Sequence, residues 1–261
     1  MILSSRKNPQ IALYRELDRE RKSRERERKF NIEGVRLCLE AARNGIKPAS
    51  FFVTQTAQSK YAEAFEEISR ICEPVIITDE LGGYISDTKS PQGFFMTAFM
   101  PDGNGELFRP GNETLIILDG LQDAGNIGTI IRTCDAMGTG GIVLSPDCAD
   151  IWSPKVVRGA MGSLFRLPVT VTELPCLIAS LQAEGWSVYA ALPDKNARSI
   201  DETRLSGRCA VVIGNEGSGV SQAVIAACGN SIYIPIENAE SLNAAVAAAV
   251  FCNEIRKNRK G

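Results

Sequence analysis

Uninterrupted apolar runs separated by amphipathic segments dominate the second half of this chain. Leu115–Leu118 and Ala210–Ile213 contain no polar residue, a pattern typical of strands that are buried on both faces of a parallel sheet. Strands are predicted at residues 114–118, 141–144, 168–171, 187–192, 209–213 and 231–234. Helices are predicted near residues 127–138, 154–161, 173–184, 221–227 and 241–258. Because strands and helices alternate, we expect a parallel sheet with helices on both faces.

The first half of the chain has shorter and less regular elements. Helices are predicted at residues 9–29, 33–44 and 60–72, and strands at residues 49–54, 75–78 and 93–99. Asn44-Gly45 is a suitable C-cap for the second helix. These elements predict a small α/β or α+β domain. Turn-forming residues crowd the stretch from Pro101 to Asn112, which we interpret as a linker between two domains.

Length and charge place limits on function. The chain has 261 residues, enough for one large domain or two of ordinary size. Its 29 basic and 31 acidic side chains give a net charge of −2. The whole-chain charge therefore does not predict a nucleic-acid-binding protein, and any basic surface must be local.

Cysteine and histidine usage excludes several kinds of site. The eight Cys residues form no Cys-x-x-Cys pair, which favours single thiols in a reducing compartment. The N-terminus is polar and Ala244–Cys252 is too short to cross a bilayer, so we expect a cytoplasmic protein without a membrane segment. The chain contains no His. This excludes a Ser-His-Asp triad and a His-ligated metal, and we expect no metal site.

Three polar loops follow predicted strands in the second half: Asp119–Gly128, Gly214–Gly219 and Pro235–Asn243. Ligands of parallel sheets bind at the carboxyl ends of the strands. All three loops fall at that position, so we expect them to form one composite site.

Each loop also has a simpler explanation when it is taken alone. Gly214–Ser221 nearly matches a phosphate-binding loop, but Val220 stands where that motif requires Lys. Gly125–Gly128 lacks the full dinucleotide spacing, so a dehydrogenase is poorly supported. A tight turn would explain the first loop, an N-cap Asn126 the second, and an N-cap Ser241 the third.

Together the three loops resemble the SpoU/TrmH family of RNA ribose 2′-O-methyltransferases, within the SPOUT superfamily. The residues that carry the resemblance are Asn126-Ile-Gly128 with Arg132, then Gly214-Asn-Glu216-Gly-Ser-Gly219, then Ile234-Pro235 with Ser241-Leu242-Asn243. The segment around Arg158 also resembles the family. The first half is similar to substrate-binding domains of the ribosomal-protein L30e/L7Ae type, through Glu33-Gly34, Phe51–Thr54 and Ser90–Gly93.

The resemblance implies a fold and a domain organisation. It implies an α/β methyltransferase domain at residues 113–261, with a six-stranded parallel sheet and a C-terminal trefoil knot. A linker at residues 104–112 would connect it to an L30e-like RNA substrate-binding domain at residues 1–103. The family dimerises through the knotted region, so a homodimer is expected.

The resemblance also implies an activity: S-adenosylmethionine-dependent methylation of a ribose 2′-hydroxyl in structured RNA. We favour 23S ribosomal RNA; a tRNA 2′-O-methyltransferase and a non-catalytic RNA-binding protein are the alternatives. The implied catalytic residues are Asn126, Arg132, Glu216, Ser241 and Asn243. The implied cofactor-binding residues are Leu192, Gly214, Gly219, Ile234 and Leu242, and Arg158 is the implied RNA-binding residue. A guanidinium keeps its proton in proteins, so we expect Arg132 to orient the 2′-oxygen while a phosphate or water takes the proton.

A charged segment near the N-terminus could also contact RNA. Residues 15–29 hold eight basic and five acidic side chains. We favour a solvated helix crossed by i,i+4 ion pairs over an RNA-facing strip.

Overall fold

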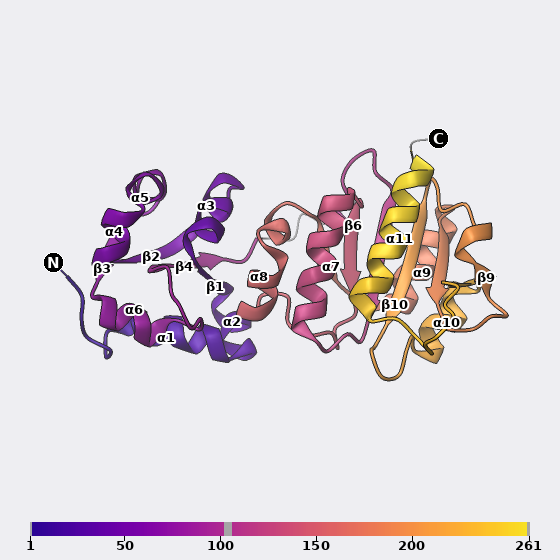
Figure 1. The fold of residues 1–261 in the computed structure, drawn as a ribbon, viewed down its shortest axis with the longest axis horizontal. Helices are drawn as coiled ribbons and strands as arrows, with labels where there is room; N and C mark the ends of the chain where they lie inside the picture. The colour runs from indigo at the N-terminus through magenta and orange to yellow at the C-terminus, as the bar shows by residue number, and fades with distance from the viewer. Residues whose placement is uncertain (1, 102–105, 260–261) are drawn as a thin grey trace. The chain divides into compact units, whose positions relative to one another are not determined.

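The chain forms two compact units. The computed structural model describes residues 2–101 and 106–259, so residues 104 and 105 of the predicted linker lie outside the described part. Unit 1 comprises Met1–Asp102 and Asp150–Phe165, and unit 2 comprises Gly103–Ala149 and Arg166–Gly261. Figure 1 shows both units along the colour gradient. A segment from the second half of the chain thus belongs to the first unit.

Unit 1 is built on a four-stranded sheet of order β1-β4-β2-β3. Its strands are β1 (Lys29–Glu33), β2 (Pro48–Thr54), β3 (Pro74–Ile77) and β4 (Phe94–Phe99). Strand β4 runs antiparallel to both β1 and β2, while β2 and β3 are parallel. Its helices are α1 (Pro9–Arg19), α2 (Arg21–Glu27), α3 (Val35–Arg43), α4 (Gln55–Lys60), α5 (Ala62–Ser69), α6 (Asp79–Ile85) and α8 (Pro154–Ala160).

The structure corrects several predicted elements of unit 1. The charged helix over residues 9–29 breaks at Glu20, which has extended φ and ψ, and ends at Arg28 with φ of 53°. The chain then enters β1, whose Phe30 and Ile32 are buried and which the helical prediction missed. The helix over residues 60–72 is two short helices joined at Tyr61. Helix α6 was not predicted.

The charged helices of unit 1 carry several internal ion pairs. Arg21 and Glu25 form an i,i+4 pair at 2.7 Å, and Arg26 contacts Glu16 at 2.9 Å. Arg24 is buried and contacts Asp150 at 2.7 Å. This pattern favours the solvated, ion-paired helix over an RNA-facing strip.

Segment Asp150–Phe165 packs on the face of unit 1 formed around Phe30. The rings of Phe30 and Trp152 lie 4.5 Å apart, and those of Phe30 and Phe165 lie 6.2 Å apart. The buried pair of Arg24 and Asp150 fixes the start of the segment. Aromatic contacts together with a buried ion pair explain why this segment groups with unit 1.

Unit 2 is a parallel sheet of seven strands, in the order β7-β6-β5-β10-β8-β11-β9. The strands are β5 (Thr114–Asp119), β6 (Gly141–Leu144), β7 (Val169–Val171), β8 (Ser187–Ala191), β9 (Arg198–Ser199), β10 (Cys209–Gly214) and β11 (Ser231–Tyr233). Every pairing within it is parallel. All the strands predicted for this half are confirmed. The two-residue strand β9 is additional, because two residues are too short to show a period.

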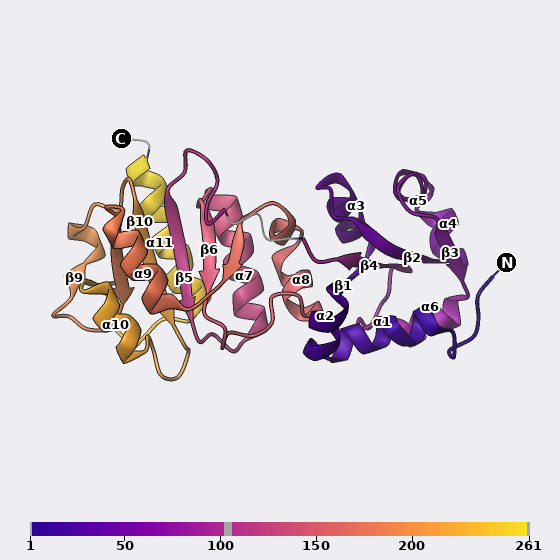
Figure 2. The ribbon, with the colours of Figure 1, turned by 180° about the vertical axis from the view of Figure 1, so that it is seen from behind.

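Helices cover both faces of this sheet, as the alternation predicted. They are α7 (Ala124–Met137), α9 (Leu174–Ala183), α10 (Gln222–Cys228) and α11 (Ala244–Arg259). Helices α7 and α11 lie side by side on one face (Figure 1), and α9 and α10 lie on the other (Figure 2). The core of the second face joins Ile178, Leu181 and Val224 to Ile117 and Val212.

The strand order brings the polar loops together. Strands β5 and β10 are neighbours, and their last residues, Asp119 and Gly214, are register partners. Asn215 Nδ2 donates to the Gly120 carbonyl oxygen at 2.7 Å. The first two loops therefore begin side by side at the carboxyl edge of the sheet.

Candidate active site

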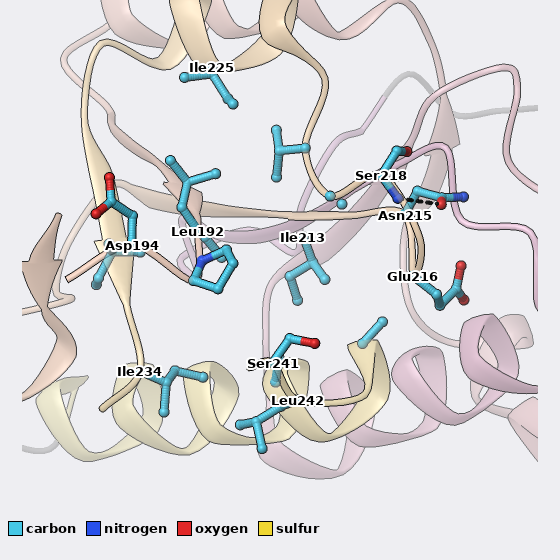
Figure 3. A pocket seen from close by; sticks show the side chains of 18 of the residues that line it. Leu192, Asp194, Ile213, Asn215, Glu216, Ser218, Ile225, Ile234, Ser241 and Leu242 are labelled. Carbon is cyan, nitrogen blue, oxygen red and sulfur yellow. Dashed lines mark hydrogen bonds between the residues drawn. The ribbon is translucent and has the colours of Figure 1, made fainter. Parts of the chain in front are cut away.

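A cavity of about 520 Å³ opens at the carboxyl edge of the unit 2 sheet. It is lined by the loops that follow β8, β10 and β11 and by the first turns of α11 (Figure 3). Its volume is in the range of pockets that bind small molecules. The five residues predicted to bind the cofactor all line it, namely Leu192, Gly214, Gly219, Ile234 and Leu242.

The loop after β10 folds back on itself within six residues. Asn215 and Gly219 exchange two backbone hydrogen bonds, of 3.0 and 2.9 Å. Asn215 Oδ1 accepts from the amides of Gly217 at 2.8 Å and Ser218 at 3.1 Å. A Cβ atom on Gly214 would stand 2.1 Å from backbone atoms of Gly219 and Val220. Only glycine fits at position 214, because backbone rather than a flexible side chain occupies that space.

Three predicted catalytic side chains form a continuous hydrogen-bonded chain. Asn126 Nδ2 donates to Glu216 Oε1 at 2.9 Å. Asn243 Nδ2 donates to Asn126 Oδ1 at 3.2 Å. One residue from each polar loop takes part, so Asn126 ties the three loops together. The composite site expected from the loop positions is thus present as a geometric arrangement.

The two asparagines are themselves fixed at helix starts. Asp123 is the N-cap of α7 and accepts from the Asn126 amide at 2.9 Å. Asn243 Oδ1 accepts from the Ala245 amide at 2.9 Å, which satisfies a donor at the start of α11. The N-cap prediction for Ser241 is wrong, since α11 begins at Ala244 and Asn243 supplies the capping oxygen. Ser241 instead lines the cavity.

Glu216 is held as a carboxylate. Partial burial by itself would raise the pKa of Glu216, but hydrogen bonds outweigh it and hold that pKa below its ordinary value. The donors are the Asn126 side chain and backbone amides of the adjoining loops. Negative charge therefore stays on this edge of the cavity at neutral pH.

Arg132 lies six residues after Asn126 on α7, and its side chain is exposed. Within residues 2–101 and 106–259 its guanidinium has no hydrogen bond or ion pair. A guanidinium without an internal partner is available to an external anion or oxygen. Arg132 does not line the cavity.

Arg158, unlike Arg132, is partly buried and forms an ion pair. It lies on α8 in unit 1, and its guanidinium contacts Asp87 Oδ2 at 2.7 Å. The Arg158 side chain is 29% exposed. An external anion would have to compete with Asp87 for this group.

The charge of the cavity limits the kinds of ligand that it can bind. Asp194 and Glu216 both line it, and among the described residues of its wall there is neither Lys nor Arg. Figure 3 shows these two carboxylates on opposite sides of the pocket. Such a wall disfavours a phosphate-bearing nucleotide and suits a nucleoside with a positive charge. Sequence reasoning missed Asp194; its only signal was a Pro-Asp turn directly after a buried strand.

Neither a candidate metal cluster nor a membrane-spanning helix occurs among the described residues. They contain no group of three or more His, Cys, Asp and Glu side chains that could hold a metal ion. In the same part of the chain, no helix combines the length and apolarity needed to cross a membrane.

Two family models match the chain. Residues 113–253 match the SpoU rRNA Methylase family, which covers more than half of the chain. Residues 8–96 match the MRM3-like substrate binding domain.

Relatives and solved structures agree with these models. The chain is 32% identical to the Bacillus subtilis 23S rRNA (guanosine(2553)-2′-O)-methyltransferase RlmP, over 97% of this chain and 98% of that protein. It is 26% identical to human mitochondrial rRNA methyltransferase 3, over 91% of this chain and 70% of that protein. A crystal structure of AdoMet-bound rRNA methyltransferase from Sinorhizobium meliloti superposes with a TM-score of 0.86 at 27% identity, covering 98% of this chain and 97% of that one. This chain belongs to the SpoU rRNA methylase family.

Proposed function

We propose that this protein transfers a methyl group from S-adenosylmethionine to a ribose 2′-hydroxyl of structured RNA, with 23S ribosomal RNA as the substrate. The observation that carries the proposal is the hydrogen-bonded chain of Glu216, Asn126 and Asn243 beside a cavity that lacks basic residues. Relatives named as ribosomal RNA methyltransferases favour ribosomal RNA over tRNA. The presence of every predicted catalytic residue argues against a non-catalytic RNA-binding protein.

The cavity fits the cofactor in size, polarity and charge. Leu192, Ile234 and Leu242 offer apolar surface to an adenine ring. Gly214 lets the loop fold closely on itself, and the open space at the Cβ position of Gly219 leaves room for a ligand. Asp194 and Glu216 complement the positive charge of the methyl donor. When bound, S-adenosylmethionine supplies an electrophilic methyl group on its sulfonium.

The side chains around the cavity have separate tasks in this proposal. Arg132 binds the 2′-oxygen and an adjacent phosphate of the RNA, which orients the hydroxyl and stabilises negative charge on it. A phosphate oxygen or a water molecule takes the hydroxyl proton. Asn126 holds the ribose, and Glu216 and Asn243 fix Asn126 in place. Ser241 contacts the target nucleotide from the cavity wall.

The domain roles extend the same proposal. Residues 1–103 would bind the RNA substrate, residues 104–112 would link the halves, and residues 113–261 would carry catalysis. We infer that Arg158 contacts RNA only after exchanging Asp87 for a phosphate. Its contribution to affinity should be smaller than that of an unpaired cation.

We also infer a trefoil knot and a homodimer. Strand β10 lies between β5 and β8 in the sheet although it follows both in the chain; the inferred knot itself rests on the match to the family. Val246 on α11 is 49% exposed and is available to a second copy. Light scattering coupled to size-exclusion chromatography would test the dimer, and a monomeric mass at micromolar concentration would contradict it.

Transfer of a labelled methyl group to ribosomal RNA tests the proposed function directly. The RNA should come from cells that lack this gene, and the modified ribose should be mapped by its resistance to alkaline cleavage. We expect one protected position. Isothermal titration calorimetry measures cofactor binding separately. Absence of both cofactor binding and methyl transfer would overturn the proposal, while transfer to tRNA alone would overturn the choice of RNA.

A further inference from the structure

Phe99, the last residue of β4, is an exposed aromatic side chain on a rigid support. Its side chain is 37% exposed. Its amide donates to the Lys47 carbonyl oxygen at 2.9 Å, and the next amide, of Met100, donates to the Arg28 carbonyl oxygen at 2.8 Å. Lys29 is its register partner on β1. The end of β4, an inner strand of its sheet, is thus hydrogen-bonded on both sides, which fixes the backbone that carries the ring.

Cationic side chains surround this ring. The Nζ atoms of Lys29 and Lys47 each lie 5.4 Å from the centroid of Phe99. Lys29 also contacts Glu27 at 3.8 Å. Lys47 is exposed and has no ion pair within the described part of the chain. The ring therefore lies in a locally positive field, although the whole chain is slightly acidic.

Tyr84 in unit 1 is a second ring flanked by two cationic side chains, but its cations are bound by other groups of the protein. Tyr84 lies under the guanidinium groups of Arg6 and Arg15, at 4.5 and 4.0 Å. Arg15 also donates to its hydroxyl group, and Arg6 is paired with Glu80. Tyr84 packs against the buried core of unit 1. Its polar group and both cations are thus satisfied internally, whereas Phe99 and Lys47 face solvent.

We propose that Phe99 is a stacking platform for an unpaired base of the RNA substrate, with Lys29 and Lys47 contacting the phosphates on either side. This inference rests on the proposed function and adds a contact point to it. Unpaired bases are recognised by stacking on aromatic rings, and the neighbouring phosphates by Lys and Arg. A rigid ring between two flexible cations provides both contacts within the reach of adjacent nucleotides.

Binding of a fluorescent single-stranded decanucleotide to the full-length protein tests the stacking contact. Phe99→Leu keeps the apolar volume and removes the aromatic face, so we expect affinity to fall by about tenfold. Phe99→Tyr should bind as the wild type does. Ile71→Ala is the matched control, because Ile71 is 51% exposed in the same unit and has no cation–π partner among the described residues. Unchanged affinity of Phe99→Leu would overturn the proposal.

A duplex of the same sequence separates stacking from charge. Its bases are already stacked, so Phe99→Leu should leave duplex binding unchanged; an equal loss on duplex would contradict a stacking role. Lys47→Gln should reduce the slope of log affinity against log salt by about 0.7 for single strands. An unchanged slope would remove Lys47 from the phosphate contact.

The same variants distinguish this inference from the proposed function. Phe99→Leu should bind S-adenosylmethionine with wild-type affinity in calorimetry and should reach wild-type methyl transfer at saturating RNA. If the wild type methylates RNA and Phe99→Leu binds it normally, only the platform is wrong. If the wild type neither binds the cofactor nor transfers methyl groups, the proposed function fails.

Discussion

The cavity of unit 2 and the surface around Phe99, Lys29 and Lys47 in unit 1 carry opposite charge. The cavity contains two carboxylates, no basic residue in its described wall, and glycines that expose the backbone. The Phe99 surface offers an aromatic ring between two Lys side chains. One suits a small cationic ligand and the other a polyanion. A chain with a net charge of −2 thus contains a locally basic surface, and the acidic cavity lies in the other unit.

Replacing Arg132 should have the largest effect on this comparison, because we propose that its guanidinium binds the RNA next to the methyl donor. We expect Arg132→Ala to lower kcat by about 10²–10³-fold, as for the loss of one stabilising donor. Cofactor affinity should stay unchanged, because Arg132 does not line the cavity. Single-turnover kinetics with calorimetry would measure both. Arg204→Ala is a suitable control for an exposed arginine of unit 2, and activity retained by Arg132→Ala would contradict its role.

Salt should separate the two surfaces without any mutation. Raising salt from 50 to 500 mM should weaken RNA binding by about 100-fold if about three phosphates are contacted. Cofactor affinity should change by less than about threefold, because few counterions are released from a small ligand. Anisotropy and calorimetry at matched salt concentrations give the two slopes. Equal salt dependence of RNA binding and cofactor binding would show that the two surfaces do not differ in how they bind charge.

Alanine substitutions at two glycines of the loop after β10 test whether the backbone shape of the cavity determines cofactor affinity. Gly214→Ala places a Cβ 2.1 Å from the backbone of Gly219, so we expect a loss of cofactor affinity of about 30-fold from overpacking. Gly219 has φ of +70° but open space around its Cβ position. Gly219→Ala should therefore cost only backbone strain and weaken binding by about fivefold. Equal effects in calorimetry would remove the close approach at Gly214 as the cause.

The pKa values of one carboxyl group in each unit are shifted in opposite directions. The pKa of Glu216 is held low by hydrogen bonds, whereas burial raises the pKa of Asp18 to about 7, with Asp87 and Glu33 adding to the effect. The protonated form of Asp18 is favoured in the fold. Its stabilisation is complete below the unfolded pKa of about 4 and is lost as pH rises through about 7.

Asp18→Asn should therefore stabilise the protein at neutral and higher pH. The new amide oxygen can still accept from Asn31, as Asp18 Oδ1 does at 2.9 Å. We expect Tm to rise by about 2–4 °C at pH 8, which corresponds to about 1 kcal/mol. The difference should disappear below about pH 4. Thermal unfolding at the two pH values checks this, and a pH-independent difference would point to a change in packing instead.

The sequence predicted unit 2 better than unit 1, and the reason is physical. Strands such as β5 and β10 are uninterrupted apolar runs because both of their faces are buried. Strand β1 follows a charged helix and begins with Lys29, so its period was hidden by the helical pattern. The two residues of β9 carry no period at all.

The sequence predicted the loops that form the site but not the hydrogen bonds between them. Glycine spacing and loop order identified Gly214–Gly219 and Ser241–Asn243. The contact of Asn126 with Glu216 depends on β5 and β10 becoming neighbours, which no local pattern shows. Asp194 was missed because a Pro-Asp turn is common after strands. The cation–π environment of Phe99 joins three separate segments and has no signature in sequence.

Because segment Asp150–Phe165 belongs to unit 1, a single cut in the linker does not separate the two units. The chain crosses between them after Asp102, after Ala149 and after Phe165. A cut within the linker would leave Trp152 and Phe165 on a fragment that lacks Phe30, and would deprive Arg24 of its buried partner Asp150. The two units are therefore not consecutive along the chain. A fragment that is meant to fold as unit 1 must therefore include both Met1–Asp102 and Asp150–Phe165.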